Sequence, residues 1–354
     1  MTRSWSRRRF LASAMTVAAV PALHTKAAAA DEPLLLRCSL ETVPSHARNV
    51  TIRDYLRKIE AATQGRIKTQ LYESGQLFPD LQVGKALLQG QIEMAAPGSW
   101  SLTGIVPDAD FLQLPTLYAR PIDILHRAVD GRPGRLLAVQ IEEKLSAHVI
   151  GPWLDLGFFN WYSTSRPLKS YGDLKGMKIR NNGGAGQAWR TQFMGAVPNT
   201  TPLPNVALAL SQGTFDGLIT TNETIASAHY WEAGIRHALE DHQFIGEYIP
   251  IVSLAFWKKL SPDLQALLTA LEGDVQLHGR HRVLRRAGLV RLADRSDRAS
   301  DRGIQRVGPA VPNVDLLRGA ADRQHADADP LRHQADRPRD RARASSPRTP
   351  PSGR

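Results

Sequence analysis

Cysteine is almost absent from this chain: its 354 residues include one, Cys38. A single thiol forms no internal disulfide, and no set of cysteines or carboxylates completes a four-ligand zinc site. Cys38 lies in the apolar run 34–40, where a lone cysteine is typical of a small core residue in a strand. The sequence also lacks the Gly-x-Ser-x-Gly element of α/β-hydrolases and a convincing pair of catalytic acids. These absences argue against a disulfide-built fold and against the common hydrolases.

The body of the chain has little net charge, although the whole chain carries +11. Residues 1–30 carry +5 and residues 281–354 carry +8, which leaves −2 for residues 31–280. The basic balance therefore belongs to the two ends, and it is poor evidence for a nucleic-acid partner. We expect no nucleic-acid binding.

The first 30 residues have the pattern of an export signal. A basic start is followed by an apolar run, 11–23, too short to span a bilayer, and by small residues up to Ala30. The run Ser6-Arg7-Arg8-Arg9-Phe10-Leu11 matches the twin-arginine pattern; a plain secretory signal with an extra arginine is the alternative. We predict cleavage near Ala30 and a periplasmic protein.

Lysine disappears from the last part of the chain: none follows Lys259. From His281 onward Arg, Asp, Ala and Pro dominate, with no apolar periodicity. We predict that residues 276–354 form a disordered Arg-rich tail, because they offer too little apolar surface to offset chain entropy. The simplest explanation of this C-terminal sequence is that the native reading frame has been lost; a genuine basic tail is the alternative.

Between these ends, apolar runs alternate with helical periodicity, which predicts an α/β fold. Strands are predicted at 34–40, 67–72, 92–95, 148–154, 178–180, 215–220 and 244–254. Helices are predicted at 50–63, 80–89, 121–129, 134–145, 186–194, 206–212 and 222–229, and from Pro262 after a Ser261 cap. Asn205 is the expected cap of the helix at 206–212.

Arg180 ends one of these strands, and a glycine-rich loop follows it. Ligands usually bind at the carboxyl ends of strands in open α/β sheets. A guanidinium presents a planar fork of N–H donors that matches a carboxylate. Arg180 is therefore a candidate carboxylate-binding residue; an ion pair with Asp173 or Glu223 at the surface is the alternative.

Two sequence motifs resemble those of a known protein family. Asp-Leu-x-Gly-x-Lys-Ile-Arg ends at Arg180, and Ala-Leu-x-x-Gly-x-x-Asp-Gly ends at Gly217. With further matches over residues 33–275, including Gly75-Gln76-Leu77 and the Phe256-Trp257 run, the chain resembles solute-binding proteins of tripartite ATP-independent periplasmic (TRAP) transporters, dicarboxylate-binding type.

The resemblance implies a two-lobed periplasmic binding protein, with a hinge and a cleft between the lobes. Residues 31–156 are expected to form lobe 1, 157–245 lobe 2, and 246–275 a crossing segment that returns to lobe 1. Relatives continue with a long amphipathic helix that this chain lacks. The implied function is capture of a small organic acid and delivery to membrane permease subunits, with no catalysis and no cofactor.

The expected ligand contacts lie at strand ends: Arg180, Trp100, Ser99, Phe159, Asn160, Thr220, Thr221 and Glu41. Family members often carry an arginine near Phe159 or Asn160, so its loss here favours a monocarboxylate with an apolar body. Thr220 and Thr221 replace an acid and amide pair, and both can donate to a ligand oxygen. Glu41 either meets an ammonium or hydroxyl of the ligand or only faces solvent.

Two other interpretations are weaker. The run Gly184-Ala185-Gly186 fails as a dinucleotide fingerprint, because Trp189 stands where the third glycine belongs. His237 and His242 with Glu240, and His278 with His281, are read as surface groups rather than metal ligands. An exported cofactor-containing enzyme remains the alternative function.

Overall fold

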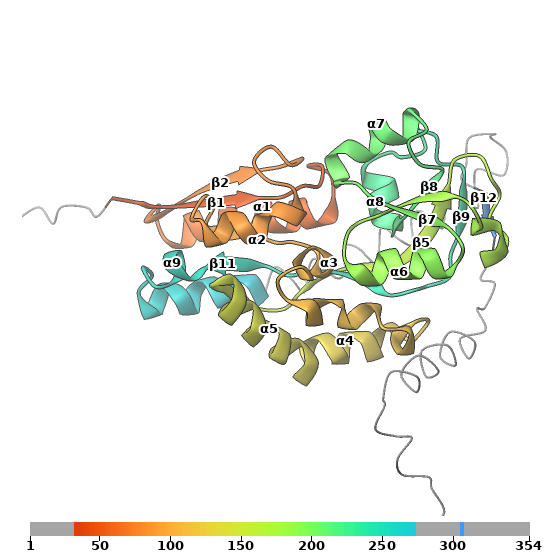
Figure 1. Ribbon diagram of the computed structural model, residues 1–354. Helices are drawn as coiled ribbons and strands as arrows, with labels where there is room; N and C mark the ends of the chain where they lie inside the picture. The colour runs from red at the N-terminus through yellow and green to blue at the C-terminus, as the bar shows by residue number, and fades with distance from the viewer. Residues whose placement is uncertain (1–31, 274–304, 308–354) are drawn as a thin grey trace, which may run out of the picture.

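Two β-sheets organise the protein, one in each of two lobes that lie side by side (Figure 1). The computed structural model describes residues 32–273 and 305–307. The sheets and their covering helices confirm the predicted α/β class and two-lobed architecture. Within the described residues, no helix is long and apolar enough to cross a membrane.

The first lobe is built on a five-stranded sheet of order β2-β1-β3-β11-β4. Its strands are β1 (Leu34–Ser39), β2 (Ile67–Tyr72), β3 (Met94–Ala95), β4 (Ala147–Val149) and β11 (Ile251–Ser253). β1 is parallel to β2 and β3, and β11 is antiparallel to its two neighbours. Because β1, β2 and β3 run the same way, their carboxyl ends meet at one edge of the sheet, which faces the second lobe.

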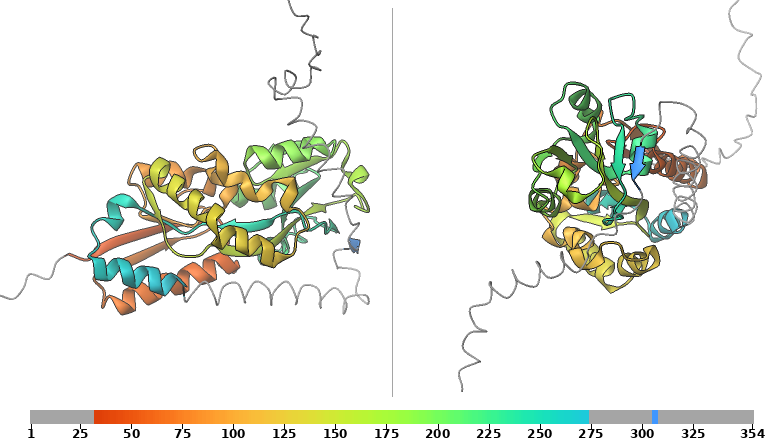
Figure 2. Two further views of the ribbon diagram at one scale, coloured as in Figure 1. Left: turned by 90° about the horizontal axis from the view of Figure 1, so that it is seen from below. Right: turned by 90° about the vertical axis from the view of Figure 1, so that its right-hand side faces the viewer.

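Helices of the first lobe connect these strands. They are α1 (Ala47–Ala62), α2 (Asp80–Leu88), α3 (Ser99–Leu102), α4 (Ile122–Asp130), α5 (Arg132–Leu145) and α9 (Leu254–Trp257), with 3-10 turns at Pro107–Gln113 and Pro115–Leu117. A helix over residues 262–273 lies beside α1 (Figure 2). Tyr55 in α1 donates to the Leu268 carbonyl at 3.1 Å, and Leu268 is fully buried. The late helix is thus part of the first lobe's core.

The second lobe contains the sheet β12-β9-β5-β8-β6-β7, with β10 paired to β5. Its strands are β5 (Leu154–Ser163), β6 (Lys178–Asn181), β7 (Val197–Thr200), β8 (Gly217–Thr221), β9 (His237–Leu239), β10 (Ile245–Tyr248) and β12 (Gln305–Val307). Its helices are α6 (Ala185–Phe193), α7 (Val206–Ser211) and α8 (Asn222–Ser227), with 3-10 turns at Tyr171–Leu174 and Leu203–Asn205. β6 and β8 are parallel, so Arg180 and Thr220 approach the same sheet edge.

Two paired strands carry the chain between the lobes. β5 leaves the first lobe and enters the second, and antiparallel β10 returns beside it before β11 joins the first sheet. Phe158 pairs with Ile245, and Asp155 pairs with Glu247. Within the described residues, this two-stranded ribbon links the lobes. The predicted lobe boundaries at 156/157 and 245/246 fall within it.

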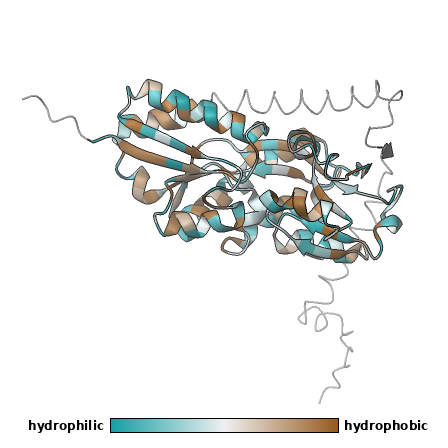
Figure 3. Cartoon of the chain, turned by 90° about the horizontal axis from the view of Figure 1, so that it is seen from above, coloured by the Kyte–Doolittle hydropathy of each residue, from teal (hydrophilic) through white to brown (hydrophobic). Residues whose placement is uncertain are grey.

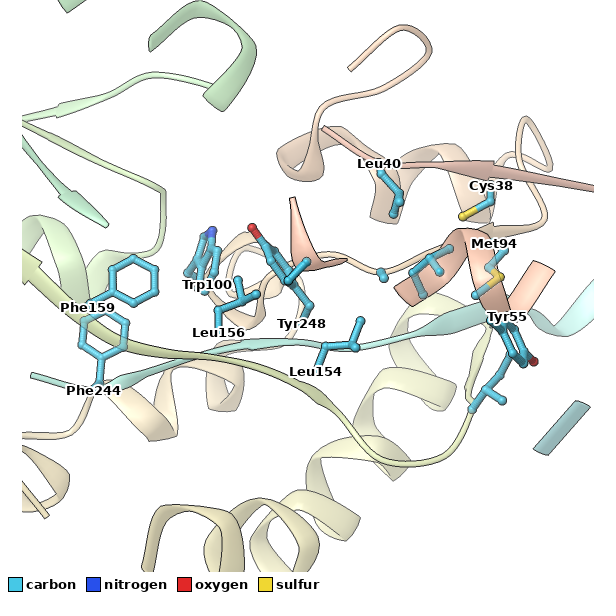
Figure 4. Close-up of a cluster of buried hydrophobic side chains, with 14 of the residues drawn as sticks. Cys38, Leu40, Tyr55, Met94, Trp100, Leu154, Leu156, Phe159, Phe244 and Tyr248 are labelled. Carbon is cyan, nitrogen blue, oxygen red and sulfur yellow. The ribbon is translucent and has the colours of Figure 1, made fainter. Parts of the chain in front are cut away.

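One apolar core follows this ribbon from lobe to lobe. Cys38 and Met94 lie in its first-lobe part, Leu154 and Tyr248 lie in the ribbon, and Phe244 lies in its second-lobe part (Figure 4). On the outside, the helices alternate hydrophilic and hydrophobic residues along their length (Figure 3). The lobes therefore share packed side chains at the crossing.

Two predicted strands are broken in the structure. The strand expected at 148–154 stops at Val149, because Gly151 has a φ of 64° and Pro152 donates no backbone hydrogen bond. The strand expected at 244–254 is split at Pro250 into β10 and β11, which belong to different sheets. The long strand β5 was not predicted, since its aromatic-rich sequence has no alternation to mark it.

Two smaller expectations also need correction. Asn205 makes no side-chain cap to α7, because a 3-10 turn precedes that helix and Asn205 has helical backbone angles. Three residues of the predicted disordered tail, Gln305–Val307, form β12 and pair with β9. The rest of the tail and the export signal lie outside the described residues.

Candidate functional site

Arg180 is completely buried near the end of β6, with 0% of its surface exposed. Its Nε donates to the Thr201 carbonyl at 2.8 Å. No described residue accepts a hydrogen bond from its two terminal nitrogens, which are also buried. Burial lowers the pKa of Arg180, while nearby Tyr230 and Glu41 partly offset this shift. The group remains a cation, since free guanidinium titrates above about pH 12.

The surface ion pair offered as the alternative for Arg180 is absent from the described residues. Asp173 instead accepts from the backbone N–H groups of Lys169 and Ser170. Glu223 accepts from the backbone N–H of Ala47 at 2.7 Å. Arg180 therefore presents two N–H-bearing nitrogens without a protein acceptor, an arrangement suited to an anion.

Glu41 lies just after β1 and is 5% exposed. Its Oε2 accepts from the backbone N–H of Asp80 at 3.1 Å. Burial, with the added repulsion of Asp80, raises the pKa of Glu41 to about 7, although Arg48 and Arg180 oppose the shift. Near neutral pH this carboxyl can accept from a ligand or donate to one.

A cavity of about 160 Å³ lies between the lobes beside Glu41. Residues of both lobes line it: Glu41, Thr42, Val43, His46 and Ser74 from the first, and Leu203, Pro204, Ala207, Thr224, Ser227, Ala228 and Tyr230 from the second. Of the predicted site residues, only Glu41 lines this cavity; Arg180 does not line it. The cavity is related to Arg180 through Glu41 and Tyr230, which line it and also act on the pKa of Arg180 together with Tyr248.

Aromatic side chains form a wall at the crossing (Figure 4). Trp100 in α3 packs edge-on against Phe159 at a centroid distance of 5.2 Å and tilts against Tyr248 at 5.4 Å. Phe159 stacks on Phe244 at 4.6 Å. Trp100 Nε1 is buried and donates to no described residue, and Ser99 is buried beside it in α3. Trp100 is therefore a second unused donor near the lobe junction.

The two threonines of β8 have different surroundings. Thr221 caps α8, because its Oγ1 accepts from the backbone N–H of Thr224 at 3.2 Å. Thr220 Oγ1 is buried and has no partner among the described residues. The register pairs Arg180 with Leu218, which places Arg180 and Thr220 on the same sheet face. Thr220 is consequently better placed than Thr221 to meet a ligand held by Arg180.

Asn160 and Phe159 point to opposite faces of the sheet, as adjacent residues of a strand do. Asn160 Oδ1 accepts from the backbone N–H of His242, and its Nδ2 donates to the Phe158 carbonyl, both at 3.3 Å. Asn160 pairs with Thr220 and so shares the sheet face of Arg180, but its amide is already hydrogen-bonded locally. Phe159 pairs with Thr221 on the other face and packs against Trp100.

Several residues of this site gave no signal in the sequence. Arg48 pairs with Asp80 at 2.7 Å and lies 3.9 Å over the Tyr248 ring. Tyr230 lines the cavity. These residues lie in separate elements, and no spacing in the sequence announces their meeting. Only the positions at predicted strand ends could be found in advance.

Contacts across the cleft hold the two lobes together. Ser45 donates to the Ser227 carbonyl at 3.0 Å, and His46 lies 3.3 Å from Thr224 Oγ1. On the α6 side, Asp110 accepts from the backbone N–H of Gly186 at 3.0 Å. The cleft is therefore closed by polar contacts in this structure.

The chain is similar in sequence to known solute-binding proteins. Residues 44–283 match the family model described as bacterial extracellular solute-binding protein, family 7. The chain is 26% identical over 268 residues to the 2,3-diketo-L-gulonate-binding periplasmic protein of Escherichia coli, covering 74% of this chain and 78% of the relative. It is 26% identical to the C4-dicarboxylate-binding periplasmic protein of Rhodobacter capsulatus, covering 72% and 73% of the two chains.

Solved structures of the same architecture are also similar. A TRAP periplasmic solute-binding protein from Sulfurospirillum deleyianum, with bound succinate, gives a TM-score of 0.74 at 21% identity, covering 83% of this chain and 94% of that one. One from Ralstonia eutropha, with bound (S)-2-acetolactate, gives 0.73 at 21% identity, covering 83% and 93%. These likenesses support the two-lobed fold.

Proposed function

The chain belongs to family 7 of the bacterial extracellular solute-binding proteins, and from this premise we propose that it captures a small monocarboxylate between its lobes. The observation that carries the proposal is Arg180, whose two terminal nitrogens are buried without a described acceptor. A carboxylate would accept from both and satisfy the buried cation. We propose binding without catalysis.

The charges around the cleft favour one carboxylate. Arg48, the other buried arginine here, is already matched by Asp80 at 2.7 Å. Arg180 is then the cation in the described cleft whose fork has no protein acceptor. The second carboxylate of a diacid would disfavour the charged form of Glu41 and would find no second unmatched cation in the described cleft. This preference would separate the protein from its relative named for C4-dicarboxylates.

The remaining cleft groups suggest the rest of the ligand. Thr220 Oγ1 and Trp100 Nε1 are buried and have no described partners, so each can meet a ligand oxygen. Glu41, at the cavity wall, suits an ammonium or hydroxyl group. Trp100 supplies apolar surface at the lobe junction. We propose a monocarboxylate with an apolar body and one hydrogen-bond donor.

We further propose export by the twin-arginine signal at residues 1–30 and delivery of the ligand to TRAP permease subunits. Arg7 and Arg8 in the basic start support the export route. Membership in an extracellular binding family supports the delivery step.

Calorimetry with a panel of carboxylic acids tests the assignment of Arg180. Arg180→Ala should weaken binding of the best acid by about 2–5 kcal/mol, because it removes the partner of a buried anion. Arg180→Lys should recover little, since a point charge cannot replace two aligned donors. Arg57→Ala is the control, because Arg57 is exposed and pairs with Asp54 on the surface.

Two results would count against the proposal. Unchanged affinity in Arg180→Ala would remove Arg180 from the site. Tighter binding of succinate than of every monocarboxylate tested would refute the single-carboxylate preference while leaving the binding function intact.

A further inference from the structure

A histidine and two buried carboxylates meet beside the crossing ribbon. They are His126 in α4, Asp155 in β5 and Glu247 in β10. Each offers one ligand atom, and these atoms all lie within 4.8 Å of one another. His126 Nε2 is 2.6 Å from Asp155 Oδ2. Their separation in the sequence explains why no metal-ligand spacing was visible there.

The two acids lie in an environment that favours a cation. Asp155 is 4% exposed and Glu247 is 0% exposed. They also face one another as a pair in the antiparallel register of β5 and β10. Like charges directly opposite on neighbouring strands destabilise a sheet, and burial increases the penalty. A divalent cation between them would attract both carboxylates and so offset their mutual repulsion.

The cluster has further features of a metal site. Asp155 Oδ1 accepts from the backbone N–H of Gly157 at 2.6 Å, which fixes the carboxylate. Fixing a ligand by a hydrogen bond to its other atom is typical of protein metal sites. The His126 side chain is 22% exposed, so an ion can reach the cluster from solvent.

The cluster is separate from the organic-acid site. Tyr248 follows Glu247 in β10 and packs against Trp100 on the cleft side. Adjacent residues of a strand point to opposite faces, so Glu247 points away from Trp100. Leu154 and Leu156, which flank Asp155, lie in the same core cluster as Tyr248. The carboxylate pair thus lies on the other face of the ribbon.

We propose that His126, Asp155 and Glu247 bind one first-row divalent cation, with a water in the remaining position. One imidazole nitrogen and two carboxylate oxygens are ligands that Zn²⁺ accepts in four-coordinate sites. The ion would tie α4 to both crossing strands. It would therefore stiffen the link between the lobes without touching the organic acid.

Calorimetric titration with Zn²⁺ tests this site on the full chain, prepared without a polyhistidine tag and stripped with chelator. One Zn²⁺ should bind per chain. His126→Gln and Glu247→Gln should each weaken binding at least about tenfold, the usual loss when a metal site is damaged. His148→Gln is the matched control, because His148 contacts Glu142 in a histidine–carboxylate pair elsewhere in the first lobe.

Thermal melting gives a second measurement. Zn²⁺ should raise the melting temperature of the parent, and it should no longer stabilise Glu247→Gln. His126→Gln, a change of a partly exposed side chain, serves if Glu247→Gln fails to fold. Absence of stoichiometric Zn²⁺ binding by the parent, or equal binding by the parent and His126→Gln, would overturn the proposal.

Discussion

At the scale of single residues, two buried arginines in the cleft differ in what faces them. Arg48 bonds to Asp80, to the Ala96 carbonyl and to Thr42, and it lies over Tyr248. Arg180 bonds only to the Thr201 carbonyl among the described residues. Arg48 therefore helps to hold the fold together, whereas the two terminal nitrogens of Arg180 can donate to a ligand.

Glu41 gives a prediction for pH. Its pKa is raised from 4.5 to about 7. The folded state thus favours the neutral acid, and the stability this provides is complete below pH 4.5 and lost as pH rises through 7. Glu41→Gln avoids that loss. In urea melts without ligand, the variant should match the parent near pH 4 and exceed it by on the order of 3 kcal/mol above pH 7.

The exposed Glu143→Gln is the control, and its difference from the parent should stay small at every pH. A Glu41→Gln advantage that does not grow between pH 4.5 and 7 would show that Glu41 is not held as a neutral acid. If the ligand carries an ammonium group, Glu41→Gln should also weaken its binding, because a carboxylate partner is lost.

The positions of the candidate site residues in the fold were predictable from the sequence only where a strand end marked them. Arg180 ends a predicted strand of the second-lobe sheet, and Glu41 and Trp100 follow predicted strands of the first-lobe sheet. The sequence could place each at a strand end, but not the two sheet edges against one another. Asn160 could not be judged, because a strand's facing depends on register, which the sequence left open. Tyr230 could not be found, since only the packing of α8 brings it to the cavity.

At the scale of elements, the loop between β6 and α6 is a point of close approach. Gly184 has φ 80° and ψ 147°, which favours glycine. A Cβ there would lie 2.9 Å from Asp110 Oδ1 and 3.2 Å from the Trp100 carbonyl oxygen, both in the first lobe. The loop therefore needs glycine both for its backbone and for contact between lobes.

Gly184→Ala should lower stability by about 1–3 kcal/mol and also weaken ligand binding. Gly213→Ala is the matched control, because Gly213 has φ 67° but nothing within 4 Å of an added Cβ. It should lower stability and leave affinity unchanged. Melting and calorimetry of both variants separate the two effects; equal affinities in the two would show that the loop does not control closure.

Helices and strands were predictable where nearby residues mark their ends. β2 was predicted at its observed bounds, since Gly65 and Gly75 punctuate the sequence on either side of it. β10 and β11 were predicted as one strand, because only the tertiary structure shows that Pro250 separates two sheets. The pairing of β5 with β10 could not be predicted either, because it joins residues far apart in the sequence.

At the scale of the whole molecule, the contacts between lobes depend on closure. Glu223 of the second lobe accepts from the backbone N–H of Ala47, at the start of the first-lobe helix α1. A carboxylate is favoured at a helix N-terminus. Against this gain, closure without ligand buries the Arg180 cation without an anion, which is costly. We expect the ligand to decide the balance between open and closed states.

Small-angle X-ray scattering should therefore give a smaller radius of gyration with the cognate acid than without it. Glu223→Ala should weaken binding by about 1–3 kcal/mol, because the Ala47 N–H loses its acceptor in the closed state. Glu232→Ala, at an exposed position in the second lobe, is the control. Identical scattering with and without ligand would contradict closure by hinge motion.

The buried Cys38 thiol offers a way to measure how often the core of the first lobe opens. The thiol is fully buried in β1, between β2 and β3, and burial raises its pKa. A thiol reagent can react only after this sheet opens, whereas movement of one lobe against the other leaves the strand covered. The rate of labelling therefore reports the lifetime of the first lobe's core, separately from the motion that captures the ligand.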